Sequence, residues 1–116
     1  MHEASIMQSV FEIACDRMER EGANRIHRLK LRVGAYSGVV VEALMFAFDA
    51  LKADTPAADA TLEVEFVPLR LYCAACDREF ASEAMPAICP GCGDWNCAIR
   101  QGQELALVSL EVSREE

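Results

Sequence analysis

Four cysteines in the second half of the chain have the types and spacing of a metal cage. They form two C-x-x-C pairs, Cys73 with Cys76 and Cys89 with Cys92, and twelve residues separate the pairs. A two-residue gap lets the backbone fold as a tight knuckle that turns both sulfurs inward, so that four thiolates can surround one ion. The sequence therefore predicts a closed four-thiolate centre, and Zn²⁺ is the ion typical of such a centre.

The residue that follows each knuckle supports this prediction. A knuckle often requires a left-handed backbone directly after its second cysteine. Gly93 adopts that conformation without steric cost, and Asp77 stands at the matching place in the first knuckle, where Asp tolerates it better than most side chains. Two redox pairs or two disulfides are the alternatives. The matched spacing and the lack of an export signal argue against both, and six cysteines then fit a reducing cytoplasm.

Two further cysteines receive no metal role. Cys15 lies at the edge of an apolar helical stripe and is interpreted as a small packed hydrophobic residue. Cys97 follows the second knuckle after four intervening residues, which fits knuckle geometry less well than two, so it is left as a spare thiol.

The start of the chain carries a second set of possible ligands. Met1 is followed by His2 and Glu3, and a bulky second residue keeps Met1 and its free α-amine in place. The amine, the His2 amide, the His2 imidazole and the Glu3 amide could supply four nitrogens. Deprotonated amides favour square-planar ions, Ni(II) or Cu(II), over tetrahedral Zn²⁺. On its own the motif is weak, because every chain begins with Met.

Composition and charge restrict the class of protein. The chain has 116 residues, 53% of them hydrophobic and 26% charged, which indicates one globular domain with room for a small insertion. The formal net charge is −8, and four thiolates with one Zn²⁺ would add −2. This acidic balance argues against nucleic-acid partners. No apolar run is long enough to span a membrane, and no nucleophile–base pair or open metal site suggests an enzyme.

Hydrophobic periodicity predicts two helices and three strands. A helix is expected from about Ser5, with Gln8 completing a capping box, to Gly22. A second helix, capped by Ser37, is expected to end at residues 54–56. Alternating patterns predict strands at residues 28–36, 62–66 and 104–112. The expected fold is α+β, with two helices on a small three-stranded mixed sheet and an inserted zinc-ribbon-like four-cysteine module.

Two of the predicted strands carry opposite charges on their solvated faces. Lys30 and Arg32 lie on the first, and Glu63 and Glu65 on the second, so the two strands are expected to be neighbours. Solvated charges without a partner are the alternative. The expected domains are residues 1–70 plus 101–116, an α+β domain that binds nickel, and residues 71–100, an inserted zinc-binding module.

Five segments of the chain form a combination that is more specific than any one of them. They are Met1-His2-Glu3, the turn Gly34-x-x-Ser37-Gly38-Val39, the helix Glu42-Ala43-Leu44-x-Phe46-Ala47-Phe48, the two knuckles, and Glu104-Leu105-x-Leu107-x-Ser109-Leu110-Glu111-Val112. Together they resemble the HypA/HybF family of nickel metallochaperones. The resemblance covers essentially the whole chain, in order. It departs at Ala35-Tyr36, where the family often has an acidic residue, and at Asp59, where Glu is common.

The resemblance implies a function, a ligand assignment and partners. His2 matches the family's nickel ligand, with the Met1 amine and Glu3 beside it, and the four knuckle cysteines match its structural zinc ligands. The family delivers Ni²⁺ for maturation of [NiFe]-hydrogenase, works with a GTPase nickel-binding accessory protein and docks on the hydrogenase large subunit. The sequence leaves open which hydrogenase is served, whether urease is also supplied, and whether the protein is a monomer or a homodimer.

Two other classes remain as alternatives. Cys89-Pro90-x-Cys92-Gly93 also looks like the knuckle of a rubredoxin, which would hold iron and transfer electrons. A zinc-ribbon interaction module would bind another macromolecule, although the acidic charge speaks against nucleic acid. Metal analysis separates iron from zinc, and retention on DNA or RNA at low salt tests the second alternative.

Overall fold

A computed structural model describes residues 2–83 and 85–116 of the chain. Met1, one of the expected nickel ligands, lies outside the described residues. The chain divides into two compact units. Unit 1 comprises residues 1–32, 39–65 and 106–116, and unit 2 comprises residues 33–38 and 66–105. The expected zinc-binding segment, residues 71–100, lies inside unit 2.

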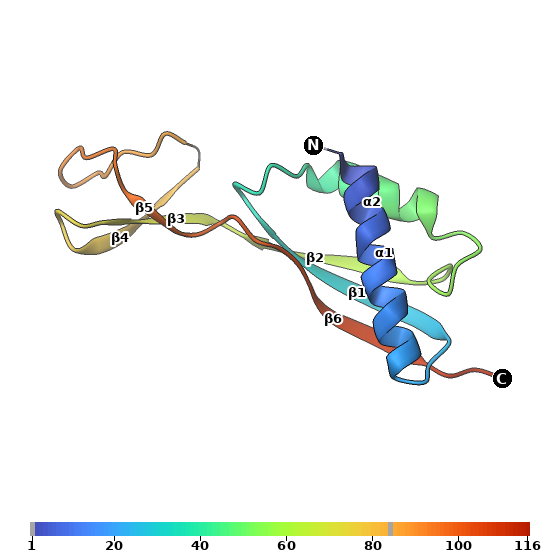
Figure 1. Cartoon of the computed structure of the whole chain (residues 1–116). Helices are drawn as coiled ribbons and strands as arrows, with labels where there is room; N and C mark the ends of the chain where they lie inside the picture. The colour runs from blue at the N-terminus through green and yellow to red at the C-terminus, as the bar shows by residue number, and fades with distance from the viewer. Residues whose placement is uncertain (1, 84) are drawn as a thin grey trace. The chain divides into compact units, whose positions relative to one another are not determined.

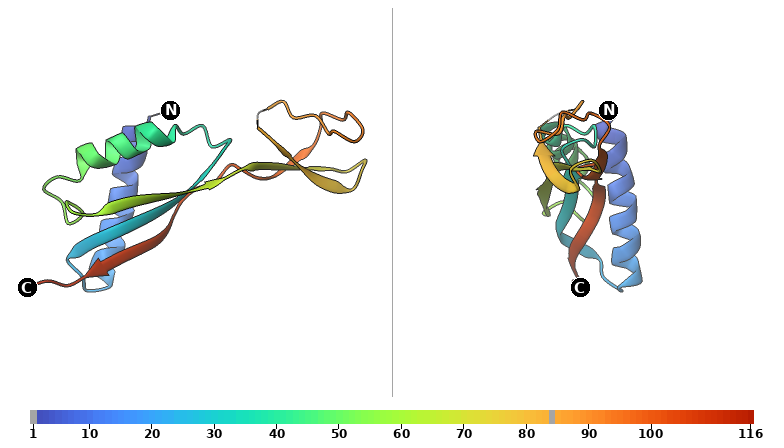
Figure 2. Two further views of the ribbon diagram at one scale, coloured as in Figure 1. Left: turned by 180° about the vertical axis from the view of Figure 1, so that it is seen from behind. Right: turned by 90° about the vertical axis from the view of Figure 1, so that its left-hand side faces the viewer.

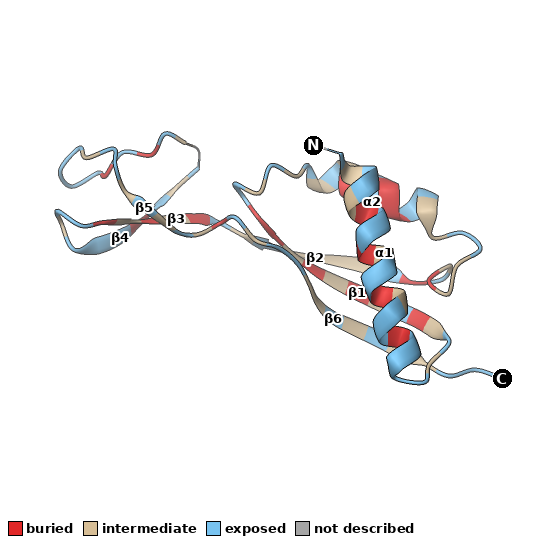
Figure 3. Cartoon of the chain, in the orientation of Figure 1, coloured by how far each residue is buried: buried red, intermediate tan, exposed pale blue. Residues whose placement is uncertain are grey.

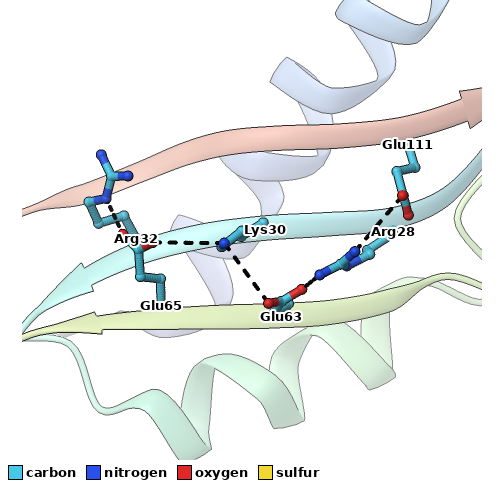
Figure 4. Close-up of polar contacts among 6 residues, drawn as sticks. All are labelled: Arg28, Lys30, Arg32, Glu63, Glu65 and Glu111. Carbon is cyan, nitrogen blue, oxygen red and sulfur yellow. Dashed lines mark hydrogen bonds and ion pairs between the residues drawn. The ribbon is translucent and has the colours of Figure 1, made fainter.

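Unit 1 is built on a three-stranded mixed sheet. The order of its strands is β2-β1-β6, with β2 at Thr61–Val67, β1 at Arg25–Gly34 and β6 at Leu105–Ser113. β1 and β2 run in the same direction and β6 runs against them (Figures 1 and 4). The connection from β1 to β2 contains a helix, as a parallel pair requires. The expected three strands and their mixed arrangement are confirmed.

Two helices complete the core of unit 1. α1 spans Glu3–Arg20 and α2 spans Val41–Leu51, and the two helices contact each other through the stacked rings of Phe11 and Phe48, 5.6 Å apart. α1 buries one stripe at helical spacing, and β1 buries alternate residues from Leu29 to Val33 (Figure 3). The buried side chains are Met7, Val10, Ala14 and Met18 of α1, Leu44, Ala47 and Phe48 of α2, and Ile26, Leu29, Leu31 and Val33 of β1.

Charged residues form a ladder of ion pairs across β1 and its neighbours (Figure 4). Arg28 pairs with Glu63, Arg32 pairs with Glu65, and Lys30 lies 4.0 Å from Glu63 and 3.8 Å from Glu65. The expectation that these two strands are neighbours is confirmed. Because the side chains are only half-buried, water screens each pair and it adds little stability, so the ladder fixes the strand register more than it stabilises the fold.

Both predicted helix starts are wrong. α1 begins at Glu3 and not at Ser5, with His2 as its N-cap. α2 begins at Val41 with Val40 as its N-cap, so Ser37 does not cap it. The acceptor for α2 comes from the other helix, because the Val40 amide donates to the Glu3 carboxylate at 3.2 Å. The two helix starts therefore support each other across a long sequence separation.

Unit 2 contains a second sheet of three short strands. Its order is β4-β3-β5, with β3 at Leu69–Cys73, β4 at Arg78–Ser82 and β5 at Ala98–Gln101, all antiparallel (Figure 2). This sheet was not expected from the sequence. Gly34 passes so close to Gly102 that a Cβ added at Gly34 would lie 2.2 Å from the Gly102 carbonyl carbon, so only glycine fits at residue 34.

Candidate metal centre

The first knuckle is the turn of the hairpin formed by β3 and β4. Cys73 ends β3 opposite Arg78, the first residue of β4. Between them the chain turns through Cys76 and then Asp77, whose φ of 52° lies in the left-handed region. The Tyr72 hydroxyl donates to the Asp77 carboxylate at 2.5 Å. The expected left-handed Asp77 is confirmed, and the hairpin register fixes where both sulfurs of this knuckle lie.

The second knuckle is a loop held by its own backbone hydrogen bonds. The Cys89 amide donates to the Asp94 carbonyl at 2.8 Å, and the Gly93 amide donates to the Cys89 carbonyl at 2.9 Å. Gly93 has the expected left-handed φ, 77°. The Gly91 amide points at the Cys89 sulfur, 3.4 Å away, and an N–H bond to sulfur favours the thiolate form.

The two knuckles bring their four sulfurs together. The Sγ atoms of Cys73, Cys76, Cys89 and Cys92 all lie within 4.8 Å of one another. The Cys73–Cys92 separation is 3.5 Å and the Cys76–Cys89 separation is 3.9 Å. Zinc–sulfur bonds of about 2.3 Å at tetrahedral angles place sulfurs about 3.8 Å apart. All six cysteines of the chain are free thiols, so no disulfide accounts for the short distances between these sulfurs. The distances instead match those expected around one metal ion.

The apolar core beside the cluster is small and includes two of the four clustered cysteines. Cys73 and Cys89 are 0% and 1% exposed, and they pack with Leu69, Leu71 and Phe80. Phe80 is buried in the same cluster as these two cysteines. Cys76 is half-buried and Cys92 is exposed. One side of the centre is therefore closed by apolar side chains, while Cys92 faces solvent.

Electrostatics show why the cluster needs a cation. Hydrogen bonds with the Cys92 and Cys89 sulfurs raise the pKa of the Cys76 thiol to about 12. The Gly91 amide, by contrast, lowers the pKa of the Cys89 thiol to about 7. Thiolates this close to one another repel, because they carry like charges. Only a bound cation makes four thiolates compatible, so binding must release protons.

Cys97 lies beside this centre, closer than the sequence suggested. Its sulfur, the Cys73 sulfur and an Asp94 carboxylate oxygen lie within 4.8 Å of one another. The Cys97 thiol also contacts the Asp94 carbonyl at 3.6 Å. Burial raises the pKa of this thiol to about 11. Cys15 is half-buried on α1 in unit 1 and takes no part in the cluster.

The described part of the N-terminal site sits at the start of α1. His2 is exposed, and Glu3 is half-buried. The first helical hydrogen bond runs from the Ile6 amide to the His2 carbonyl at 3.1 Å. The amide nitrogens of His2 and Glu3 precede that bond and have no carbonyl partner within the helix. The hydrogen bond from the Val40 amide lowers the pKa of the Glu3 carboxylate, which is therefore held by α2.

The small sheet of unit 2 carries two knuckles whose four sulfurs could surround one ion. This arrangement is typical of a metal-binding protein. A family profile described as "Hydrogenase/urease nickel incorporation, metallochaperone, hypA" matches residues 1–112. The chain therefore belongs to the HypA family and is a nickel metallochaperone of hydrogenase maturation. The resemblance seen in the sequence is confirmed.

Individual relatives agree over their whole length. A hydrogenase maturation factor HypA of Picosynechococcus sp. is 46% identical over 112 residues, covering 97% of this chain and 99% of the relative. One from Roseiflexus sp. is 43% identical, covering 96% and 91%. The solution structure of the Ni metallochaperone HypA from Helicobacter pylori is similar in fold, with a TM-score of 0.69 and 27% identity, covering 99% of this chain and 100% of that one. No helix among the described residues is long and apolar enough to cross a membrane.

Proposed function

We propose that this chain binds Ni²⁺ through its first three residues and holds Zn²⁺ in its four knuckle cysteines. The proposed nickel ligands are the Met1 amine, the His2 amide and imidazole, and the Glu3 amide. The observation that carries this proposal is the position of the first helical hydrogen bond, from Ile6 to His2. Nickel can take the His2 and Glu3 amide nitrogens without breaking a backbone–backbone hydrogen bond of α1, and only the contact of the Glu3 amide with its own carboxylate would be lost.

The charge at this site also suits a helix start. Two deprotonated amides neutralise Ni²⁺, so the complex adds no net positive charge where the helix dipole is already positive. The Glu3 carboxylate stays with the Val40 amide, which leaves the Glu3 amide nitrogen as its contribution to the metal. Because amide protons must leave, nickel affinity should rise with pH.

The zinc centre is proposed to be structural. Four protein ligands leave no open position, so the ion cannot bind and activate water as a catalytic zinc does. This supports a carrier that is not an enzyme. Unit 1 with the N-terminal nickel site and unit 2 with the zinc site are proposed to act as separate functional domains. The rubredoxin-like alternative would place iron in the same cysteines.

The partners proposed here follow from family membership. We expect the protein to work in the cytoplasm, to receive or pass nickel with a GTPase accessory protein, and to dock on the hydrogenase large subunit. His2 is exposed, so the ion can leave without unfolding of unit 1. Urease is a second possible client, and a monomer and a homodimer both fit this role.

Nickel titration of the untagged, zinc-loaded protein tests the proposal. His2→Ala, which removes the imidazole nitrogen, and a form extended by several residues before Met1, which removes the free amine, should each weaken nickel binding by at least about tenfold. The extension must be longer than one residue, because a histidine third in the chain would itself form a four-nitrogen nickel site. His27→Ala is the matched control, since His27 is the only other histidine and its ring bonds Ser113 in unit 1. Cys73→Ala should lower zinc content and leave nickel affinity intact.

Two results would contradict the proposal. Unchanged nickel affinity in both His2→Ala and the extended form would remove the N-terminal site. Iron in place of zinc, in protein purified without added metal, would favour the rubredoxin-like alternative. The visible spectrum of bound Ni(II) provides a further check, because square-planar amide coordination is low-spin and yellow, without thiolate bands.

A further inference from the structure

Cys97 has a thiol that could bind a metal ion, and neither the proposed nickel site nor the proposed zinc site uses it. Its sulfur lies within 4.8 Å of the Cys73 sulfur and of an Asp94 carboxylate oxygen. Cys97 and Asp94 are half-buried, whereas Cys73 is fully buried. One of these three atoms, the Cys73 sulfur, also belongs to the proposed zinc centre. The other two belong to half-buried residues at the edge of that centre.

The sheet of unit 2 builds this triangle. Tyr72 of β3 pairs with Ala98 of β5 in antiparallel register, so the next residue of β3, Cys73, comes beside the residue before β5, Cys97. Cys97 is also packed against the apolar cluster that holds the zinc ligands. The pairing of β3 with β5 thus positions both Cys73, a proposed zinc ligand, and the Cys97 sulfur beside it.

The loop between the knuckle and β5 places the carboxylate. The Asp94 carbonyl accepts from the Cys89 amide at 2.8 Å and from the Cys97 thiol at 3.6 Å. Its side-chain Oδ1 accepts from the Asn96 amide at 3.0 Å, which fixes the direction of the carboxylate. A carboxylate has about four lone-pair sites, so one such bond leaves capacity for an ion.

We propose that Cys73, Asp94 and Cys97 form a second, open metal subsite that shares the Cys73 sulfur with the zinc centre. A thiolate sulfur has enough lone pairs to bridge two ions. Two sulfurs and one carboxylate oxygen leave a fourth tetrahedral position for water or another ligand. Sulfur donors select a thiophilic divalent ion such as Zn²⁺, Co²⁺ or Ni²⁺ over Mg²⁺ and Ca²⁺. Binding releases the Cys97 thiol proton to solvent.

The charge of the filled zinc cage favours a second cation. Four thiolates and one Zn²⁺ carry a net −2, and Asp94 adds −1. A Cβ built at Gly91 would lie 2.7 Å from an Arg78 guanidinium nitrogen and 3.3 Å from the Cys76 sulfur, so one positive charge already lies near Cys76. A cation bound at Cys73, Asp94 and Cys97 would offset more of the remaining negative charge.

This inference rests on the proposed zinc occupancy of the four knuckle cysteines, and the experiment separates the two. The full-length His2→Ala protein, which lacks the proposed nickel site, is loaded with zinc and its zinc content is measured. It is then titrated with cobalt(II) chloride in reducing, oxygen-free buffer. Zinc is spectroscopically silent, whereas cobalt bound by sulfur gives charge-transfer absorption, and a zinc-sensitive dye reports any zinc released.

We expect one cobalt ion per chain to bind with sulfur charge-transfer absorption while zinc stays at one per chain. In the same background Cys97→Ser should abolish that absorption, and Asp94→Asn, which keeps an acceptor for the Asn96 amide, should weaken cobalt binding by at least about tenfold. Cys15→Ser is the matched control, because Cys15 lies on α1 in the other unit, and it should change nothing.

Three outcomes would overturn the subsite. They are no sulfur-to-cobalt absorption, absorption that survives Cys97→Ser, and absorption that grows only as zinc is released, which would place cobalt in the four-cysteine cage. Failure to find zinc before the titration is a different result, because it contradicts the proposed zinc centre itself. Zinc content near one per chain in Cys97→Ser shows that unit 2 is still folded.

Discussion

Removing a buried leucine that does not touch metal should weaken zinc binding. Leu71 is 0% exposed at the centre of β3, where it pairs with Phe80 of β4 and Ile99 of β5. It lies two residues before Cys73. Because the apolar core of unit 2 contains few other large side chains, we expect this unit to fold only together with its metal, as small metal-binding modules do.

The expected size of the effect follows from cavity formation. Leu→Ala at a fully buried site costs about 2–5 kcal/mol, and about 3 kcal/mol is reasonable in a core this small. If folding of unit 2 and zinc binding are one event, the whole cost appears in zinc affinity. At about 1.4 kcal/mol per factor of ten, Leu71→Ala should raise the zinc dissociation constant about 100-fold, as measured by competition with a chromophoric chelator.

A matched variant separates this effect from general damage. Leu29 is also 0% exposed, but it lies in β1 within unit 1. Leu29→Ala should destabilise unit 1 by a similar amount and leave the zinc dissociation constant unchanged. Unchanged zinc affinity in Leu71→Ala would refute the reasoning, because it would mean that unit 2 is already folded without metal. Equal zinc losses in both variants would mean that the two units fold as one.

Two further changes test the backbone and the ion-pair ladder. Gly34→Ala should destabilise unit 2 by more than the roughly 1–3 kcal/mol typical of overpacking, because the added Cβ would overlap the Gly102 carbonyl group. Thermal unfolding measures this loss of stability. An unchanged midpoint of unfolding would contradict the close contact. The hydrogen bond with Arg32 lowers the pKa of Glu65 below its ordinary value, so Glu65 stabilises the fold above the ordinary pKa of a Glu and loses this effect as the pH falls through the lowered pKa. The stability difference between wild type and Glu65→Gln should therefore shrink on acidification, and a difference that does not depend on pH would exclude this origin.

Local sequence rules predicted the knuckles and the pairing of β1 with β2 but missed the helix starts. A C-x-x-C knuckle is defined within six residues, so the left-handed backbone at Asp77 and Gly93 could be read from spacing alone. Charge alternation similarly predicted the pairing of β1 with β2. The acceptor for the Val40 amide at the start of α2, in contrast, is the Glu3 carboxylate, 37 residues earlier. No capping rule that examines three or four neighbouring residues can find an acceptor at that distance.

The second sheet was missed for a related reason. β3, β4 and β5 are only four or five residues long, too short for alternation to be distinguished from chance. Their register depends on the knuckle turn and on burial of Leu69 and Leu71, which are tertiary effects. The same register brings Cys97 beside Cys73. Counting residues from Cys92 therefore underestimated how close Cys97 lies to the metal centre.

The proposed zinc and nickel sites should differ in affinity because only the zinc site organises a core. Zinc would hold together the residues that form the interior of unit 2, so its binding free energy includes the folding of that unit. His2 and Glu3, the described part of the proposed nickel site, precede the first hydrogen bond of α1, and neither belongs to the apolar core of unit 1. Nickel binding would therefore gain nothing from folding and lose nothing on release. A chain built this way could retain one ion permanently and pass another to a partner.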